Sequence, residues 1–139
     1  KPIYLIGCGW YNEQVKPYSH NSHGCIDFEY NQLTEVYDHI IARNLNSRVI
    51  LYAHFGYEYE YWPIPLHVHI SRKLIDFGFD AIIGSHTHTI QAYEQYNNSP
   101  IFYGLGNFYF KSELRSLSYN FVCGCQKASK KLVCKNVYH

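Results

Sequence analysis

The sequence predicts an α/β fold in which a sheet is covered by helices. Three short apolar runs, each closing on or near glycine, predict buried strands: "PIYLIG", "RVILYAHFG" and "DAIIG". Between them lie two stretches whose apolar residues recur every three or four positions, the spacing of an amphipathic helix. The order strand, helix, strand, helix, strand is typical of a parallel sheet.

Both predicted helices carry an apolar stripe that would face the sheet. The first lies within "NQLTEVYDHIIARNL", after a polar stretch at 21–31 that we expect to be an exposed loop. The second follows the turn-forming "WPIP", and we expect Gly78 to end it in a left-handed conformation. The stripe residues are Leu33, Val36, Tyr37, Ile40 and Ile41 in the first helix, and Leu66, Ile70, Leu74 and Ile75 in the second.

Beyond Gln91 the pattern changes to antiparallel strands. "QAYEQYNNSPIFYGLG" predicts two strands around the turn "NNSP", and "YNFVCGCQKASKKLVCKNVYH" predicts a final hairpin around "KASK". No repeat, low-complexity segment or linker divides the chain, so we expect residues 1–139 to belong to a single domain.

Composition excludes several classes of partner. Twelve Lys and Arg nearly balance eleven Asp and Glu, so no basic surface indicates nucleic acid. No apolar run reaches the roughly twenty residues that a membrane-spanning helix needs, and the first residues are too short an apolar run for a signal peptide. Five cysteines without a CxxC pair argue against a zinc knuckle. We expect buried free thiols, which favour a reducing compartment.

Three histidines follow two neighbouring strands of the predicted sheet. His54 ends the second strand, and His86 and His88 come directly after the third. Sites in such sheets lie beyond the carboxyl ends of the strands, and alternate residues of extended backbone share a face. Neutral imidazole is a common ligand of zinc, manganese and iron. An HxH pair alone is also typical of hydrogen-bonded loop residues, but the third histidine makes a metal site the favoured interpretation.

The blocks "AHFGYEYEYWPIP", "LIDFGFDAIIGSHTHTIQAYE" and "SPIFYGLGNFYF" carry a family resemblance over roughly residues 48–112. Together they closely resemble the capsule synthesis protein CapA family, which is linked to poly-gamma-glutamate and belongs to the calcineurin-like metallophosphoesterase superfamily. "IGCGWYNEQVKP" extends the similarity more loosely. The resemblance implies half of a four-layer α/β sandwich with C-terminal antiparallel strands.

The resemblance also implies roles for the histidines and one carboxylate. The family's His-Trp-Gly-x-Glu block appears here as His54 to Glu58, and its Gly-x-His-x-His block ends in His86 and His88. His54 and His86 would ligate one divalent metal, Mn, Fe or Zn, and His88 a second. With Glu58, they would be the catalytic residues of metal-assisted hydrolysis. Glu58 could orient His54 or act as a base, with a solvated loop carboxylate as the equal alternative.

Further residues match the family's downstream motifs. Gln91 and Glu94 match a Gln-x-x-Glu pattern, and Asn107 lies in a Leu-Gly-Asn-Phe block. We expect Gln91 and Asn107 to bind substrate or support the ligands, the alternative being turn residues that satisfy backbone groups. His67 stands where the family often carries Gln. We expect His67 and His69 to be surface or packing residues.

The chain lacks other elements that the superfamily's site requires. It contains no Gly-Asp block and no Asn-Asn-His or Gly-Asn-His block. Asp38 and Asp76 lie on predicted helices, and Asp80 begins a strand at the end away from the crevice. The chain therefore resembles the C-terminal half of the domain, with three histidine ligands and no carboxylates to bridge two metals. An N-terminal segment or a partner chain would have to supply them.

Two functional hypotheses follow. The first is a metal-dependent hydrolase domain acting on a phosphoester or an anionic polymer, with Arg72, Lys73 and Lys111 as the nearest basic side chains. The second is a non-catalytic remnant or a polymer- or metal-binding module. The family implies action at the cell envelope, whereas the free cysteines favour a reducing interior.

Overall fold

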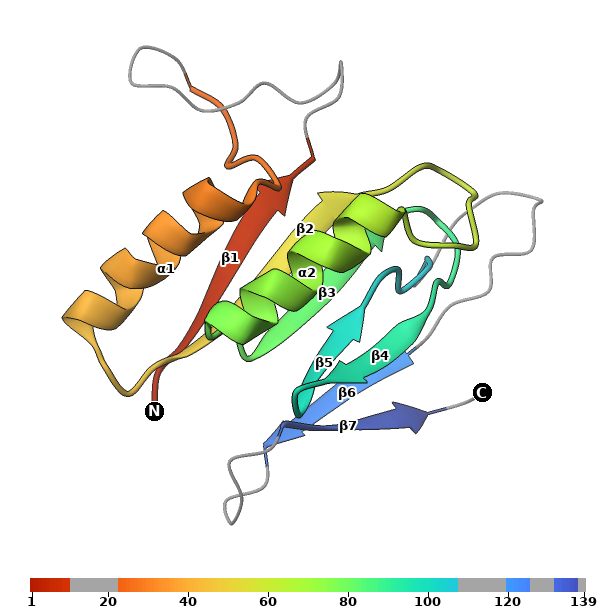
Figure 1. Ribbon diagram of the computed structural model, residues 1–139. Coiled ribbons are helices and arrows are strands. Elements are labelled where there is room, and N and C mark those ends of the chain that lie inside the picture. The colour runs from red at the N-terminus through yellow and green to blue at the C-terminus, as the bar shows by residue number, and fades with distance from the viewer. Residues whose placement is uncertain (11–22, 108–119, 126–131, 138–139) are drawn as a thin grey trace.

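The computed structural model describes residues 1–10, 23–107, 120–125 and 132–137, and it confirms the α/β class. A five-stranded sheet has the order β1-β2-β3-β5-β4, and β6 and β7 form a separate two-stranded sheet (Figure 1). The elements are β1 (Ile3–Gly9), α1 (Tyr30–Arg43), β2 (Arg48–Phe55), α2 (Pro65–Phe77), β3 (Ala81–His86), β4 (Tyr93–Tyr96), β5 (Ser99–Phe102), β6 (Asn120–Cys125) and β7 (Leu132–Val137).

The first three strands are parallel, as predicted, and β2 lies between β1 and β3. β5 adds to β3 in parallel and β4 pairs with β5 antiparallel, which confirms the predicted hairpin. Its turn is shorter than "NNSP". Asn97 and Asn98 have φ of 45° and 65°, and Ser99 is already in β5. Asparagine tolerates this left-handed backbone better than most residues. β6 and β7 confirm the second antiparallel pair, while its "KASK" turn lies outside the described residues.

Both helices have identifiable ends. α1 begins at Tyr30, inside the stretch expected to be loop, because the Glu29 carboxylate accepts hydrogen bonds from the amides of Asn31 and Gln32. α2 begins with Pro65 in its first turn, where the missing N–H has no cost. Gly78 ends α2 with φ of 140°, which confirms the expected left-handed backbone. Neither helix is long and apolar enough to cross a membrane.

The two helices cover one face of the sheet (Figure 1). Alternate residues of β2 are almost fully buried toward them, with Leu51 at 0% and Phe55 at 1% exposed. On the opposite face, Leu5 is 67% and Tyr52 42% exposed, and the described residues place no helix there. The sheet is therefore covered by helices on one side, and its other side is an exposed apolar surface.

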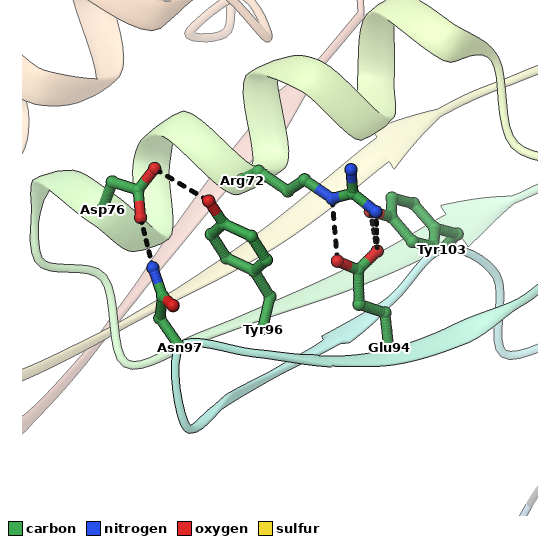
Figure 2. Close-up of polar contacts among 6 residues, drawn as sticks. All are labelled: Arg72, Asp76, Glu94, Tyr96, Asn97 and Tyr103. Atoms are coloured by element: carbon green, nitrogen blue, oxygen red, sulfur yellow. Dashed lines mark hydrogen bonds and ion pairs between the residues drawn. The ribbon is translucent and has the colours of Figure 1, made fainter.

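Polar contacts fix α2 to the β4–β5 hairpin (Figure 2). Arg72 donates to both carboxylate oxygens of Glu94 at 2.8 and 3.2 Å, and the Tyr103 hydroxyl donates to the same carboxylate at 3.0 Å. One helical turn away, the Tyr96 hydroxyl donates to Asp76 at 3.1 Å. These contacts hold the hairpin beside the third strand, from which the candidate site residues follow.

The described cysteines agree with the expected free thiols. Cys8 on β1 is buried, and Cys25 is half-buried. Burial, followed by the nearby Cys25 and Asp27, raises the pKa of the Cys8 thiol to about 12. Cys8 is therefore protonated and unreactive at neutral pH.

His67 on α2 is a packing residue, whereas His69 on the same helix is exposed. The His67 ring is 1% exposed and contacts the rings of Trp10, Phe28 and Phe55 at centroid distances of 4.6, 5.3 and 4.7 Å. Neither of its ring nitrogens has a hydrogen-bond partner among the described residues. This burial lowers the pKa of His67 to about 4.

Two glycines provide a matched test of the packing on β3. A methyl group at Gly84 would collide with the backbone carbonyl of Tyr103, whereas one at Gly7 on β1 would meet nothing within 4 Å. We expect Gly84→Ala to lower the free energy of unfolding by about 1–3 kcal/mol, as overpacking does. We expect Gly7→Ala to change it by less than about 0.5 kcal/mol. Urea unfolding of both variants tests this, and equal effects would contradict the packing.

The buried His67 makes stability depend on pH. Its pKa is about 4 in the folded chain against 6.5 for a free side chain, so the unfolded chain binds more protons between these values. Stability must therefore fall as the pH falls below 6.5. Between pH 7 and pH 5 we expect this histidine to remove on the order of 2 kcal/mol of unfolding free energy. His67→Leu should lose that dependence, and the exposed control His69→Leu should keep it. An unchanged slope in His67→Leu would refute the assignment.

Candidate functional site

The structure brings the three predicted histidines to one edge of the sheet, at the carboxyl ends of β2 and β3. Pairing of these strands places Phe55 opposite His86, and the rings of His54 and His86 lie 4.5 Å apart between centroids. His88 follows two residues later and is close enough to influence the ionisation of His54. His54 and His86 thus lie together at the ends of β2 and β3, with His88 nearby.

The surroundings of His54 favour its neutral form. Burial lowers the pKa of His54, and His86 and His88 lower it further, while the Glu58 carboxylate partly offsets them. Positive charge on a neighbouring histidine disfavours protonation of His54. Neutral imidazole is the form that binds a metal ion.

The backbone of the HxH segment is strained. His86 has φ of 92° and His88 has φ of 56°, values that side-chain-bearing residues rarely adopt. Thr87 between them is 1% exposed and packs against Gly56 and Gly104. A Cβ atom added to Gly56 would lie 2.8 Å from the Thr87 Cγ2 atom, and one added to Gly104 would lie 2.7 Å from the Thr87 Oγ1 atom. A backbone conformation of this kind costs about 1–3 kcal/mol per residue, so it persists only where the surrounding packing enforces it. Residues with such strained backbone cluster at functional sites.

Two side chains hold the ring of His88. Its Nδ1 lies 2.6 Å from the Asn107 Oδ1 atom, and the Tyr59 ring stacks on it with centroids 5.8 Å apart and planes at 27°. The sequence motifs include Asn107 but indicate no role for Tyr59. A ring contact between segments so far apart in the chain leaves no sequence pattern from which it could be predicted.

His54 has a longer contact with Ser85 on the neighbouring strand. The Ser85 hydroxyl donates to the backbone carbonyl of Ala53 at 3.3 Å and lies 3.5 Å from His54 Nδ1. The sequence motif indicates no role for this serine. Its position opposite His54 in the strand register explains the contact.

Gln91 anchors the loop after β2. It is 6% exposed, and its side-chain amide donates to the backbone carbonyls of Glu60 at 3.0 Å and Trp62 at 3.2 Å. The Thr89 hydroxyl adds a hydrogen bond to the Glu60 carbonyl at 2.6 Å. These contacts tie the 57–62 loop to the histidine segment. Substrate binding by Gln91 stays a prediction.

The carboxylates of Glu58 and Glu94, which the sequence motifs include, have different surroundings in the structure. Glu58 is exposed and acts on His54 through its charge. Glu94, the other half of the Gln-x-x-Glu match, is paired with Arg72 in the contact between α2 and the hairpin (Figure 2). Among the basic candidates, Lys73 lies 4.3 Å from the centre of the Tyr30 ring, and Lys111 lies outside the described residues.

The histidines fit part of a metal site. Neutral imidazoles are suitable donors, and two of them are adjacent. Within the part of the chain that the structure describes, however, no three His, Cys, Asp or Glu side chains converge closely enough to hold a metal ion. The donor chemistry therefore fits a metal, but the described donor set is incomplete.

Comparison with known proteins places this site in a family. The model of the family "bacterial capsule synthesis protein PGA_cap" matches residues 9–112, which include every predicted site residue. The capsule biosynthesis protein CapA of Bacillus anthracis is 39% identical over 62 residues, or 45% of this chain and 15% of the relative. The PGA biosynthesis protein CapA of Bacillus subtilis is 40% identical over 62 residues, or 45% of this chain and 16% of the relative.

An uncharacterized protein of Sinorhizobium fredii is 49% identical over 41 residues, which are 30% of this chain and 9% of that protein. The chain thus spans about one sixth of the two Bacillus proteins it matches. The family model, in contrast, covers most of the chain, from the end of β1 past Asn107. The chain therefore belongs to the bacterial capsule synthesis protein PGA_cap family, as the resemblance of its three sequence blocks implied.

Proposed function

We propose that this chain contributes the histidine half of a divalent-metal centre that hydrolyses a phosphoester in capsule biosynthesis. The observation that carries the proposal is the adjacency of His54 and His86, with ring centroids 4.5 Å apart at the carboxyl ends of two parallel strands. His88 follows on the same strained segment. The names of the Bacillus relatives, capsule biosynthesis and PGA biosynthesis, support a role in making the capsule and hence action at the cell envelope.

In this proposal each residue has a defined task. A bound Mn, Fe or Zn ion would lower the pKa of a water molecule and stabilise charge on a phosphoryl oxygen. His54, His86 and His88 would hold the metal through neutral imidazole nitrogens. Glu58, exposed and electrostatically coupled to His54, is the candidate proton acceptor. Gln91 keeps the 57–62 loop, which carries Glu58, beside the histidines.

The uncovered face of the sheet supports a site completed by another layer. Parallel sheets are almost always buried on both faces, yet Leu5 and Tyr52 are exposed on the face opposite the helices. Exposed apolar surface of this kind marks a place where another element packs. We propose that a further sheet layer, from the same polypeptide or a partner chain, covers this face and brings the missing carboxylates.

A second candidate is a binding module without catalysis. It is favoured by the absence of any converged group of three metal-ligating side chains among the described residues. The histidine cluster would then bind a metal ion, or line a crevice for an anionic polymer, without reaching the donor number that hydrolysis requires.

Metal binding by the isolated chain tests the proposed histidine set. After equilibrium dialysis against Zn²⁺ or Mn²⁺, we expect plasma mass spectrometry to find metal in the wild type and little in His86→Ala/His88→Ala, because two of three donors are removed. The matched control is His39→Ala/His69→Ala, which removes two exposed histidines on α1 and α2 and should retain the metal.

Equal metal content in all three proteins would contradict the proposed ligands, and so would its absence from a folded wild type. Hydrolysis of bis(p-nitrophenyl) phosphate by the metal-loaded wild type would support the hydrolase. Stoichiometric metal without hydrolysis would support the ligand set alone, because the hydrolase also needs the missing carboxylates.

A further inference from the structure

A side-chain contact joins Asn107 to one ring nitrogen of His88. Asn107 Oδ1 lies 2.6 Å from His88 Nδ1, a short hydrogen bond for a nitrogen donor. An amide oxygen only accepts hydrogen bonds, so with the Asn107 amide in this orientation the ring donates from Nδ1. In neutral imidazole the other nitrogen, Nε2, then carries the lone pair.

The backbone around Asn107 is tied to the histidine segment. The amide of Gln91 donates to the carbonyl of Gly104 at 3.0 Å, and the amide of Leu105 donates to the carbonyl of Gly84 at 3.3 Å. Gly106 has φ of 70°, a conformation that glycine adopts without strain. Residues 104 and 105 are thus hydrogen-bonded to the segments before and after the His-x-His pair. These bonds fix the position of the backbone from which the Asn107 side chain extends.

The ring of His88 is also held on its face. Tyr59 stacks on it at 27°, and the amide of Tyr59 donates to the carbonyl of Thr87 at 2.7 Å. Among the described residues, the contact at the His54 Nδ1 atom is the 3.5 Å approach of the Ser85 hydroxyl. The Nδ1 contact of His88 is therefore much stronger than that of His54.

We propose that Asn107 is a positioning residue that keeps the proton of His88 on Nδ1 and directs the Nε2 lone pair to the metal. Partners of this kind fix the tautomer and orientation of a ligating histidine and raise its basicity. The use of that lone pair rests on the proposed metal function. The tautomer does not, and it can be measured without metal.

The tautomer is read from the ring nitrogens of His88. We would record long-range ¹H–¹⁵N spectra of the metal-free chain at mildly alkaline pH for wild type, Asn107→Asp and Asn107→Leu. Asp keeps an acceptor at the same place, and Leu has a similar shape without one. The control is Asn46→Leu, at an exposed loop position between α1 and β2.

We expect the proton on Nδ1 in wild type, Asn107→Asp and the control, and a shift of population toward the Nε2–H form in Asn107→Leu. A wild-type proton on Nε2 would overturn the proposal. So would an unchanged tautomer in a folded Asn107→Leu chain. The wild-type and Asn107→Asp spectra decide the tautomer even where Asn107→Leu fails to fold.

Zn²⁺ titration separates this proposal from the metal function. Loss of such a partner typically weakens metal binding by about 10–100-fold, and we expect that range for Asn107→Leu with near wild-type affinity in Asn107→Asp. Equal Zn²⁺ affinity despite a changed tautomer would overturn the positioning role. A wild type with the expected tautomer that binds no Zn²⁺ would refute the proposed metal function and leave the tautomer assignment standing.

Discussion

The parallel pairing of β2 with β3 is the constraint on which the rest of the structure depends. It places Phe55 opposite His86 and so brings two histidines from different strands to one edge. The pairing is enforced from the helix side, because Leu51 and Phe55 are buried beneath α1 and α2. A slip by one residue would turn these side chains to the exposed face and separate the histidines. Burial of a few apolar residues therefore determines the geometry of the polar site.

Most of the fold could be predicted because its elements have strong periodicity. The apolar runs of β2 and β3 and the three- and four-residue spacing in α1 and α2 indicate alternating strands and helices, and the order of elements implies a parallel sheet. The apolar pattern could not predict that helices cover only one face of the sheet, because a continuous apolar run such as "RVILYAHFG" is typical of a strand buried on both faces. The start of α1 at Tyr30 was also missed, because Glu29 supplies an unusual carboxylate cap.

The part of the site that lies at the ends of strands could be predicted from the sequence. His54, His86 and His88 were predicted from their places at the ends of two strands, and the structure confirms that the rings of His54 and His86 lie together. Contacts between residues far apart in the chain could not be predicted from the sequence pattern. Asn107 contacts His88, 19 positions away, and Gln91 contacts the 57–62 loop, about 30 positions away. Glu94 matched a motif yet serves the contact between α2 and the hairpin. A motif identifies a residue, whereas packing decides what it contacts.

In the proposed function, His54, His86 and His88 form the nitrogen side of a metal centre. X-ray absorption spectroscopy of the zinc-loaded chain tests it most directly, because imidazole ligands have a recognisable scattering pattern. We expect imidazole nitrogens at about 2.0–2.1 Å from zinc, and their loss in His86→Ala/His88→Ala. A spectrum of oxygen ligands alone, identical in wild type and variant, would contradict it.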